Sequence, residues 1–157
     1  MFSLELQRAM LNSEVFYVPD FYDLGVTIED AEEDALYARS VDNIKLYDHG
    51  FCSRTPYLTN EKVKDFCKII GDAIKDSRVD AHFYCAYDRE FIGFGKHSDE
   101  TDILYIQCVG ETEWEVDDLK YKLKEKDAIF FPARSVHEVI SLTGPRLGCS
   151  FGFKAVR

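Results

Sequence analysis

The chain has 157 residues, of which 46% are hydrophobic and 14% aromatic, so it can bury a sizeable core and is not a disordered protein. Asp and Glu number 29 against 19 Lys and Arg, and the net charge of -10 comes without the basic stripe of a protein that binds duplex nucleic acid. We expect neither a signal peptide nor a membrane span, because no run approaches the roughly 18 apolar residues that a span needs.

The cysteines are odd in number and include no C-x-x-C pair. They are Cys52, Cys67, Cys85, Cys108 and Cys149. Three of them fall within apolar strand patterns, where a reduced cysteine acts as a small hydrophobic residue. We therefore expect a reducing, cytoplasmic setting. The oligomeric state stays open, a homodimer included.

We expect a single domain over residues 1–157, whose residues 1–78 form a helical part with edge strands. The predicted elements are a helix over Phe2–Leu11, a strand over Val15–Val18, a helix from the N-cap Thr27 through Tyr37, a strand over Ile44–Tyr47 and a loop over Asp48–Tyr57. Asp30 stands three residues after Thr27, which is near the spacing of a capping box.

The clearest helix begins at Asn60. Its apolar residues recur at helical spacing on one face, and Lys and Asp occupy the other. The apolar face consists of Val63, Phe66, Cys67, Ile70 and Ile74. This face is expected to pack against the sheet that the second half of the chain forms.

After Asp80 the pattern changes to β. Strands are predicted over Val79–Tyr87, Ile92–Gly95, Asp102–Val109, Glu113–Val116, Leu119–Leu123, Ala128–Phe131, Val136–Ser141 and Arg146–Phe153, with Asp117 and Asp118 as a hairpin turn. The linkers are too short for crossover helices, so the sheet is expected to be antiparallel and either closed or sandwiched. Alternate residues share a face, but the pattern leaves open which face of the later strands points inward.

Three side chains of this second half form a candidate metal site. His97 and Asp99 lie just before an apolar strand, and His137 begins a later strand after Pro132. Two imidazoles and one carboxylate leave three adjacent positions open on an octahedral metal, which is the arrangement of non-haem Fe(II) sites that react with O2. The sequence predicts a metal site at these three residues and no catalytic residue beyond them.

The segment around H-x-D resembles the JmjC-type hydroxylases of the cupin superfamily. Residues 79–116, VDAHFYCAYDREFIGFGKHSDETDILYIQCVGETEWEV, show that family's aromatic-rich strand, Gly-Phe-Gly approach, H-x-D and apolar strand ending in Gln, and the later EKDAIFFPARSVHEVIS resembles its second motif. The resemblance implies a mainly β fold with a double-stranded β-helix (cupin or jelly-roll) core over residues 79–157 and N-terminal helices packed on its outside. It also implies Fe(II) at His97, Asp99 and His137, with 2-oxoglutarate as cosubstrate.

One position departs from the family pattern. The family usually places Lys or Arg two residues after the equivalent of Gly110, to bind the distal carboxylate of 2-oxoglutarate, and this chain has Thr112. Other 2-oxoglutarate oxygenases, such as the prolyl hydroxylases, are similar in having an arginine near the position of Arg146, followed by a small or hydroxyl residue. The cosubstrate site is therefore expected to involve Arg146, Ser150, Tyr84 and the Thr112 position; the alternative for Arg146 is a surface turn.

Further residues are candidates for the pocket wall. His82 shares a strand face with Tyr84, while Tyr105 and Gln107 have the same parity as the H-x-D pair. Ordinary strand packing is the alternative for each of them. Asp102 either supports a ligating histidine or caps the start of its strand.

The leading functional hypothesis is an Fe(II)/2-oxoglutarate-dependent dioxygenase, most simply a hydroxylase, acting on a protein side chain or a small molecule. Its partners would be 2-oxoglutarate, O2 and a substrate that the sequence does not identify. The alternative is a metal-dependent cupin without 2-oxoglutarate, such as a sugar isomerase or a small-molecule dioxygenase, which Thr112 favours. A binding cupin without catalysis is a third class, against which the complete ligand set argues.

Overall fold

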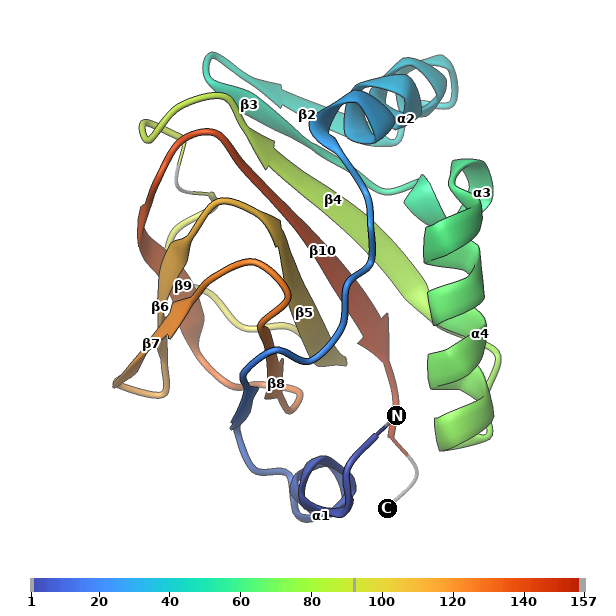
Figure 1. Cartoon of the computed structure of the whole chain (residues 1–157), viewed down its shortest axis with the longest axis vertical. Coiled ribbons are helices and arrows are strands. Elements are labelled where there is room, and N and C mark those ends of the chain that lie inside the picture. The colour runs from blue at the N-terminus through green and yellow to red at the C-terminus, as the bar shows by residue number, and fades with distance from the viewer. Residues whose placement is uncertain (1, 92, 156–157) are drawn as a thin grey trace.

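The computed structural model describes residues 2–91 and 93–155 (Figure 1). In chain order the elements are α1 (Leu4–Asn12), β1 (Phe16–Val18), α2 (Ile28–Ser40), β2 (Ile44–Tyr47), β3 (Gly50–Ser53), α3 (Pro56–Thr59), α4 (Glu61–Ile74), β4 (Asp80–Ala86), β5 (Asp102–Val109), β6 (Thr112–Val116), β7 (Leu119–Leu123), β8 (Ala128–Phe131), β9 (His137–Leu142) and β10 (Arg146–Phe153). Most predicted elements are present within two or three residues of their expected bounds.

The strands form two facing sheets. The large sheet has the order β1-β8-β5-β10-β4-β3-β2, and the small sheet has the order β7-β6-β9. Every pairing between the described strands is antiparallel. The chain leaves the large sheet after β5, forms β6 and β7, and returns with β8, which is the winding of a double-stranded β-helix. The expected fold class is confirmed.

The first 78 residues supply the edges of the large sheet. β1 pairs with β8 at one edge, and the hairpin of β2 and β3 adds to β4 at the other. Edge strands from the N-terminal part therefore extend the sheet on both sides of the core strands, as the sequence predicted for β1 and β2.

The helices cover the outer face of the large sheet (Figure 1). In α4 the predicted stripe is buried at Val63, Phe66, Ile70 and Ile74, and the ring of Phe66 packs on Phe151 of β10 with centroids 4.9 Å apart. The expected packing of this helix is confirmed. No helix in the described part of the chain has the length and apolarity needed to cross a membrane.

A second core fills the space between the two sheets. Its buried members are Ile103, Tyr105, Trp114, Val116, Leu123, Ile129, Phe131 and Val139. On β5, Tyr105 therefore points inward, whereas Leu104 and Ile106 join the outer core beneath the helices. On β10, Leu147, Cys149 and Phe151 also lie in the outer core, so Arg146 and Ser150 take the inner face. The tertiary structure thus shows which face of these strands points inward, which the alternation of residues left open.

The prediction of a loop over Asp48–Tyr57 is wrong, because this segment contains β3 and the first two residues of α3. The buried carboxylate of Asp34, in α2, accepts hydrogen bonds from the hydroxyls of Ser53, Thr55 and Thr59. These bonds satisfy the polar side chains of the segment as it enters the interior. A segment that looked too polar for regular structure is therefore buried against α2.

The structure also differs from the prediction of a strand over Ile92–Gly95. Residues 93–95 are not in a strand, and Ile92 lies outside the described residues. Gly93 and Gly95 have φ values of 107° and 77°, which strand residues do not adopt. Two other local predictions are confirmed. Asp117 and Asp118 form the hairpin turn with φ of 48° and 67°. Thr27 and Asp30 form a complete capping box at the start of α2.

Candidate metal centre

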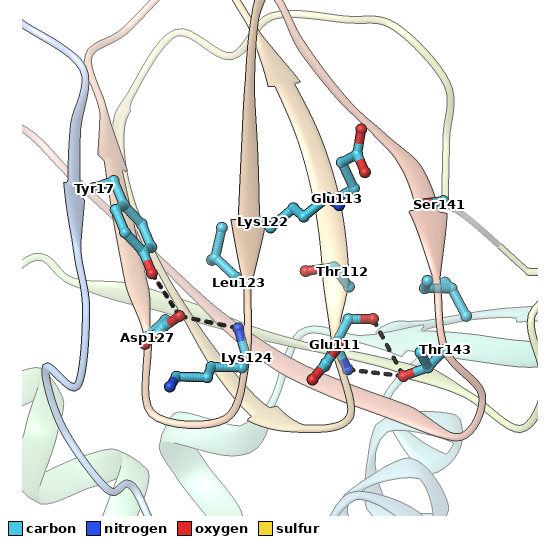
Figure 2. A pocket seen from close by; sticks show the side chains of 11 residues that line it. Tyr17, Glu111, Thr112, Glu113, Lys122, Leu123, Lys124, Asp127, Ser141 and Thr143 are labelled. Carbon is cyan, nitrogen blue, oxygen red and sulfur yellow. Dashed lines mark hydrogen bonds between the residues drawn. The ribbon is translucent and has the colours of Figure 1, made fainter.

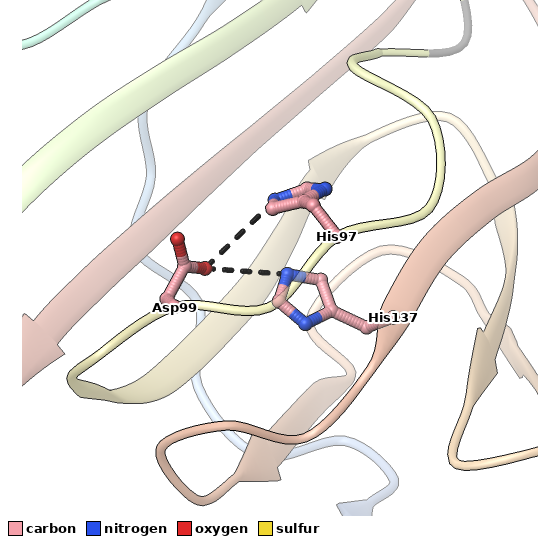
Figure 3. A group of neighbouring side chains, drawn as sticks. All are labelled: His97, Asp99 and His137. Atoms are coloured by element: carbon pink, nitrogen blue, oxygen red, sulfur yellow. Dashed lines mark ion pairs between the residues drawn. The ribbon is translucent and has the colours of Figure 1, made fainter.

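The structure brings His97, Asp99 and His137 together, as predicted. One ligand atom from each lies within 4.8 Å of the other two. Oδ2 of Asp99 is 3.9 Å from Nε2 of His97 and 3.3 Å from Nε2 of His137, and Figure 3 shows this oxygen facing both rings. The three donors converge on one point, which is the geometry that a single metal ion requires.

Hydrogen bonds fix the orientation of both imidazole rings. Nδ1 of His97 lies 2.7 Å from the carbonyl oxygen of Gly95, and Nδ1 of His137 lies 2.9 Å from the carbonyl oxygen of Ser135. A carbonyl only accepts, so each Nδ1 carries the proton and each Nε2 keeps its lone pair free for a metal. Both rings are therefore held in the tautomer that can bind a metal.

The Asp99 carboxyl is ionised readily. When the imidazole of His137 is protonated, its hydrogen bond to Asp99 lowers the pKa of this carboxyl below the ordinary value, and protonated His97 and His82 act in the same direction. The backbone of Asp99 is held as well, because its carbonyl accepts from the amide of Arg134 at 2.7 Å. A carboxylate that is ionised and fixed in place is a ready metal ligand.

The three ligands line one pocket between the sheets. Its wall comprises Tyr84, Gly93, Phe94, Gly95, His97, Asp99, Ile103, Trp114, Phe131, His137, Glu138, Val139, Arg146 and Ser150. Three of the four expected cosubstrate residues, Arg146, Ser150 and Tyr84, are among them. The surface-turn alternative for Arg146 is excluded, since this side chain is only 1% exposed.

Arg146 is a buried cation with free donors. Its Nη1 lies 3.4 Å from the hydroxyl oxygen of Tyr105, whereas Nε and Nη2 have no hydrogen-bond partner among the described residues. A buried charged group with unused donors is costly unless an anion satisfies them. The pocket is therefore chemically incomplete on the side of Arg146 and suited to an anionic group.

Thr112, Tyr105 and Gln107 are not among the residues that line this pocket. The hydroxyl of Thr112 donates to Oε1 of Gln107 at 2.7 Å, and the hydroxyl of Tyr105 donates to the same oxygen at 3.0 Å. Tyr105 lies on the inner face of β5, where its hydroxyl oxygen is 3.4 Å from Nη1 of Arg146 on the neighbouring β10. Parity alone gives no sign of this second layer.

His82 is likewise not among the residues that line the pocket. Its Nε2 lies 4.0 Å from Oδ2 of Asp80, and burial lowers the pKa of the imidazole. The ring is stacked beside Tyr84, with centroids 6.3 Å apart. Asp102 accepts backbone hydrogen bonds from Ala133 and Ala155, which fits a cap at the start of β5, one of the two roles expected for it.

The chain is similar to known proteins in both sequence and fold. Residues 55–128 match the family model of the JmjC domain. This match covers just under half of the chain. The resemblance that the sequence suggested is thereby confirmed, and no curated protein sequence matches the chain.

Solved structures agree with this family match. The chain is similar to YcfD, a ribosomal oxygenase from Escherichia coli, solved in complex with cobalt and succinic acid, with a TM-score of 0.75 and 16% identity over 100% of this chain and 53% of that one. The same values hold for YcfD in complex with cobalt and 2-oxoglutarate. The chain therefore spans about half the length of the solved protein, and the likeness concerns the fold.

Phe94 also lines the pocket, although it was not among the residues expected there. Its ring contacts Tyr84 and His97, with centroids 5.7 and 6.2 Å away, and is 41% exposed. From the β2–β3 hairpin, Tyr47 packs on it with centroids 5.8 Å apart and Lys45 lies 5.3 Å above the ring. The Gly-Phe-Gly sequence, an exposed aromatic between two flexible residues, was the available signal.

A second, larger pocket of about 390 Å³ lies at the other end of β6 (Figure 2). Thr112 lines it and pairs with Leu123 and Leu142, whereas the metal end of the same strand pairs Val116 with His137. Its buried carboxylate, Asp127, is already occupied by the hydroxyl of Tyr17 at 2.7 Å and by the amide of Lys124 at 3.0 Å. This pocket therefore offers a ligand no unused buried donor or acceptor of the kind that Arg146 provides.

Proposed function

We propose that the chain is an Fe(II)/2-oxoglutarate-dependent oxygenase, most simply a hydroxylase. The observation that carries this proposal is the placement of Arg146. A buried guanidinium with free Nε and Nη2 faces the same pocket as His97, Asp99 and His137. A metal triad and an anion-binding group in one pocket are the two parts that binding a metal and a keto acid together requires.

The donor set of the triad fits Fe(II). Two neutral imidazole nitrogens and one carboxylate suit a first-row metal and leave three adjacent positions open. The tautomers fixed by Gly95 and Ser135 support this fit. The structures of YcfD in complex with cobalt support a metal for this chain as well.

The pocket also fits 2-oxoglutarate through its distal carboxylate. Nε and Nη2 lie on one edge of the guanidinium, and that edge can donate two parallel hydrogen bonds to a carboxylate. Ser150 lines the same pocket from the same face of β10 and can add a third donor. Charge pairing would satisfy the otherwise unpaired Arg146, which supports an anionic ligand rather than a neutral one.

When bound, Fe(II) and 2-oxoglutarate supply the oxidative chemistry with O2. The residues of the chain hold and orient them. His97, Asp99 and His137 fix the metal, while Arg146 fixes the far end of the cosubstrate. The apolar side chains of Trp114, Phe131 and Val139 line the pocket and exclude bulk water from the reacting groups.

The direct test loads the protein with Fe(II) under anaerobic conditions, adds 2-oxoglutarate and then O2, and measures succinate. We expect 2-oxoglutarate to be consumed slowly even without substrate and faster once a substrate is supplied. The proposal fails if fully Fe(II)-loaded protein neither binds nor turns over 2-oxoglutarate. Protein with Asp99→Ala is the matched control for free iron.

The alternative is a metal-dependent cupin that does not use 2-oxoglutarate. Its support was the absence of a cation at Thr112, and an Arg146 that points to solvent would have strengthened it. Arg146 is buried and lines the same pocket as the metal ligands, which favours the oxygenase over this alternative. Metal-loaded protein that isomerises sugars without 2-oxoglutarate would reverse it.

Two further observations support a substrate class and a cellular setting. The name of YcfD as a ribosomal oxygenase supports a protein side chain over a small molecule as the substrate class. The free thiols of all five cysteines support a reducing, cytoplasmic setting. A screen of peptides and metabolites for stimulated succinate release would separate the two substrate classes.

A further inference from the structure

A chain of buried hydrogen bonds lies directly behind the arginine of the pocket. The indole Nε1 of Trp114 donates to Oγ1 of Thr112 at 3.1 Å, and this hydroxyl donates to Oε1 of Gln107 at 2.7 Å. The hydroxyl of Tyr105 donates to the same oxygen at 3.0 Å. Nε2 of Gln107 donates to the carbonyl of Val109 at 2.8 Å, which fixes the orientation of the amide and hence the direction of every proton.

The direction of these bonds makes Tyr105 an acceptor toward Arg146. Because Gln107 takes the phenol proton, the lone pairs of the Tyr105 oxygen remain free, and Nη1 of Arg146 lies 3.4 Å from that oxygen. A Cβ atom at Gly148 of β10 would collide with the phenol oxygen and ring. Glycine at this position therefore leaves the room in which Tyr105 reaches Arg146.

This contact determines which part of the guanidinium faces the pocket. With Nη1 engaged by Tyr105, the unpaired atoms are Nε and Nη2. Their N–H groups lie side by side on one edge and match the two oxygens of a carboxylate. A guanidinium without this contact could rotate and present Nη1 and Nη2 instead, at a different distance from the metal ligands.

We propose that Tyr105, oriented by Gln107 and Thr112, is a positioning residue that holds the Nε–Nη2 edge of Arg146 toward the pocket and so sets the length of the dicarboxylate that fits. The inference rests on the proposed function, since it concerns the same cosubstrate site. Thr112 suits this role because a hydroxyl accepts from Trp114 and donates to Gln107 at once. A lysine ammonium only donates, and would leave the indole N–H without its acceptor.

The test measures binding of 2-oxoglutarate and of 2-oxoadipate, which is one methylene longer, to Mn(II)-loaded protein by calorimetry under argon. We expect the unaltered protein to prefer 2-oxoglutarate. In Tyr105→Phe the affinity for 2-oxoglutarate should fall about tenfold, as expected for loss of a bond to a charged group, and the preference over 2-oxoadipate should narrow. Affinity for Mn(II) should stay within about twofold, because the triad is untouched.

Thr112 provides a second pair of variants if Tyr105→Phe does not fold. Thr112→Val keeps the shape of the side chain but removes the hydroxyl. It should lower the affinity for 2-oxoglutarate and narrow the preference over 2-oxoadipate, as Tyr105→Phe does. Thr112→Ser keeps a hydroxyl and should retain both the affinity and the preference of the unaltered protein. Arg146→Gln separates the hypotheses. If Arg146→Gln loses 2-oxoglutarate binding while Tyr105→Phe and Thr112→Val keep both affinity and preference, the positioning role alone is overturned. If Arg146→Gln binds 2-oxoglutarate like the unaltered protein, the anchor itself is wrong and the positioning role falls with it.

Discussion

His97 and His137 are joined by two backbone hydrogen bonds, 3.1 Å from the amide nitrogen of His97 to the carbonyl oxygen of His137 and 2.8 Å in the other direction. Together they form an isolated antiparallel bridge between ligands that lie far apart in the sequence. Their ring centroids are 4.4 Å apart, and both rings are oriented through Nδ1. The backbone therefore sets the spacing of the ligands, and the site is organised before a metal binds.

Replacing His137 with Ala should abolish tight metal binding without unfolding the protein. Loss of a group that merely supports a ligand already costs about 10- to 100-fold in metal affinity, so loss of a ligand should cost at least about 100-fold. Co(II) absorption and calorimetry measure the affinity. His49→Ala is the matched control, because His49 pairs with Asp88 and Glu90 on the surface and should bind Co(II) unchanged. Equal Co(II) affinity in His137→Ala would remove this residue from the ligand set.

Replacing Arg146 with Met should stabilise the protein while it destroys cosubstrate binding. The buried guanidinium has two unpaired nitrogens, and removing such a group for an apolar one of similar length gains about 1–4 kcal/mol of unfolding free energy in comparable cases. The unaltered protein should gain about 2.7 kcal/mol from 2-oxoglutarate at 100 times its Kd, and the variant nothing. Urea unfolding with and without 2-oxoglutarate measures both. The exposed Arg39→Met should change neither quantity.

Replacing Asp34 with Ala should destabilise the protein by about 1–3 kcal/mol, because three hydroxyls, two of them buried, lose their acceptor. These belong to Ser53, Thr55 and Thr59. Chemical unfolding gives the free energy, with the exposed neighbour Glu33→Ala as control. Equal stability of the two variants would show that these hydroxyls find other acceptors.

Stability at high pH should depend on Tyr17. Burial and then the hydrogen bond to Asp127 raise the pKa of its phenol from 10.0 to about 12. The folded state therefore binds this proton more tightly than the unfolded state, so its contribution is complete below pH 10.0 and is lost as the pH rises through about 12. Unfolding free energies between these values should fall less steeply in Tyr17→Phe than in the exposed control Tyr37→Phe. Parallel curves would contradict the assignment.

Phe94 should control access to the metal. The free space in the pocket is about 40 Å³, which holds about three water molecules, so larger ligands can enter only if this ring moves. Its neighbours Gly93 and Gly95 have positive φ angles and allow such movement. We expect Phe94→Ala to speed removal of Co(II) by a chelator severalfold at unchanged affinity, measured by stopped-flow absorption. Phe94→Tyr should behave like the unaltered protein, and identical rates in all three would exclude a gate.

The sequence by itself determined the local features of this protein. Helical spacing predicted α4, alternation and short linkers predicted the antiparallel strands, and the pair Asp117-Asp118 predicted a turn that the structure contains. The three ligand candidates followed from residue type and motif order, because H-x-D and the distal His carry their chemistry in the side chains themselves. Local rules act over a few residues, so a single sequence is enough to read them.

Only the tertiary structure decided which groups meet. The inward face of β10, and hence the fate of Arg146, depends on packing its other face beneath α4, which no strand pattern specifies. Likewise, the sequence shows that position 112 lacks the cation of the family pattern. It does not show that the hydroxyl of Thr112 links Trp114 to Gln107. Buried polar groups choose partners by distance in space, and β pairing joins residues far apart in the chain. The metal site could therefore be predicted from its ligands. The sequence left open whether Arg146 binds an anion beside that site or lies in a surface turn, and only the fold decided between these placements.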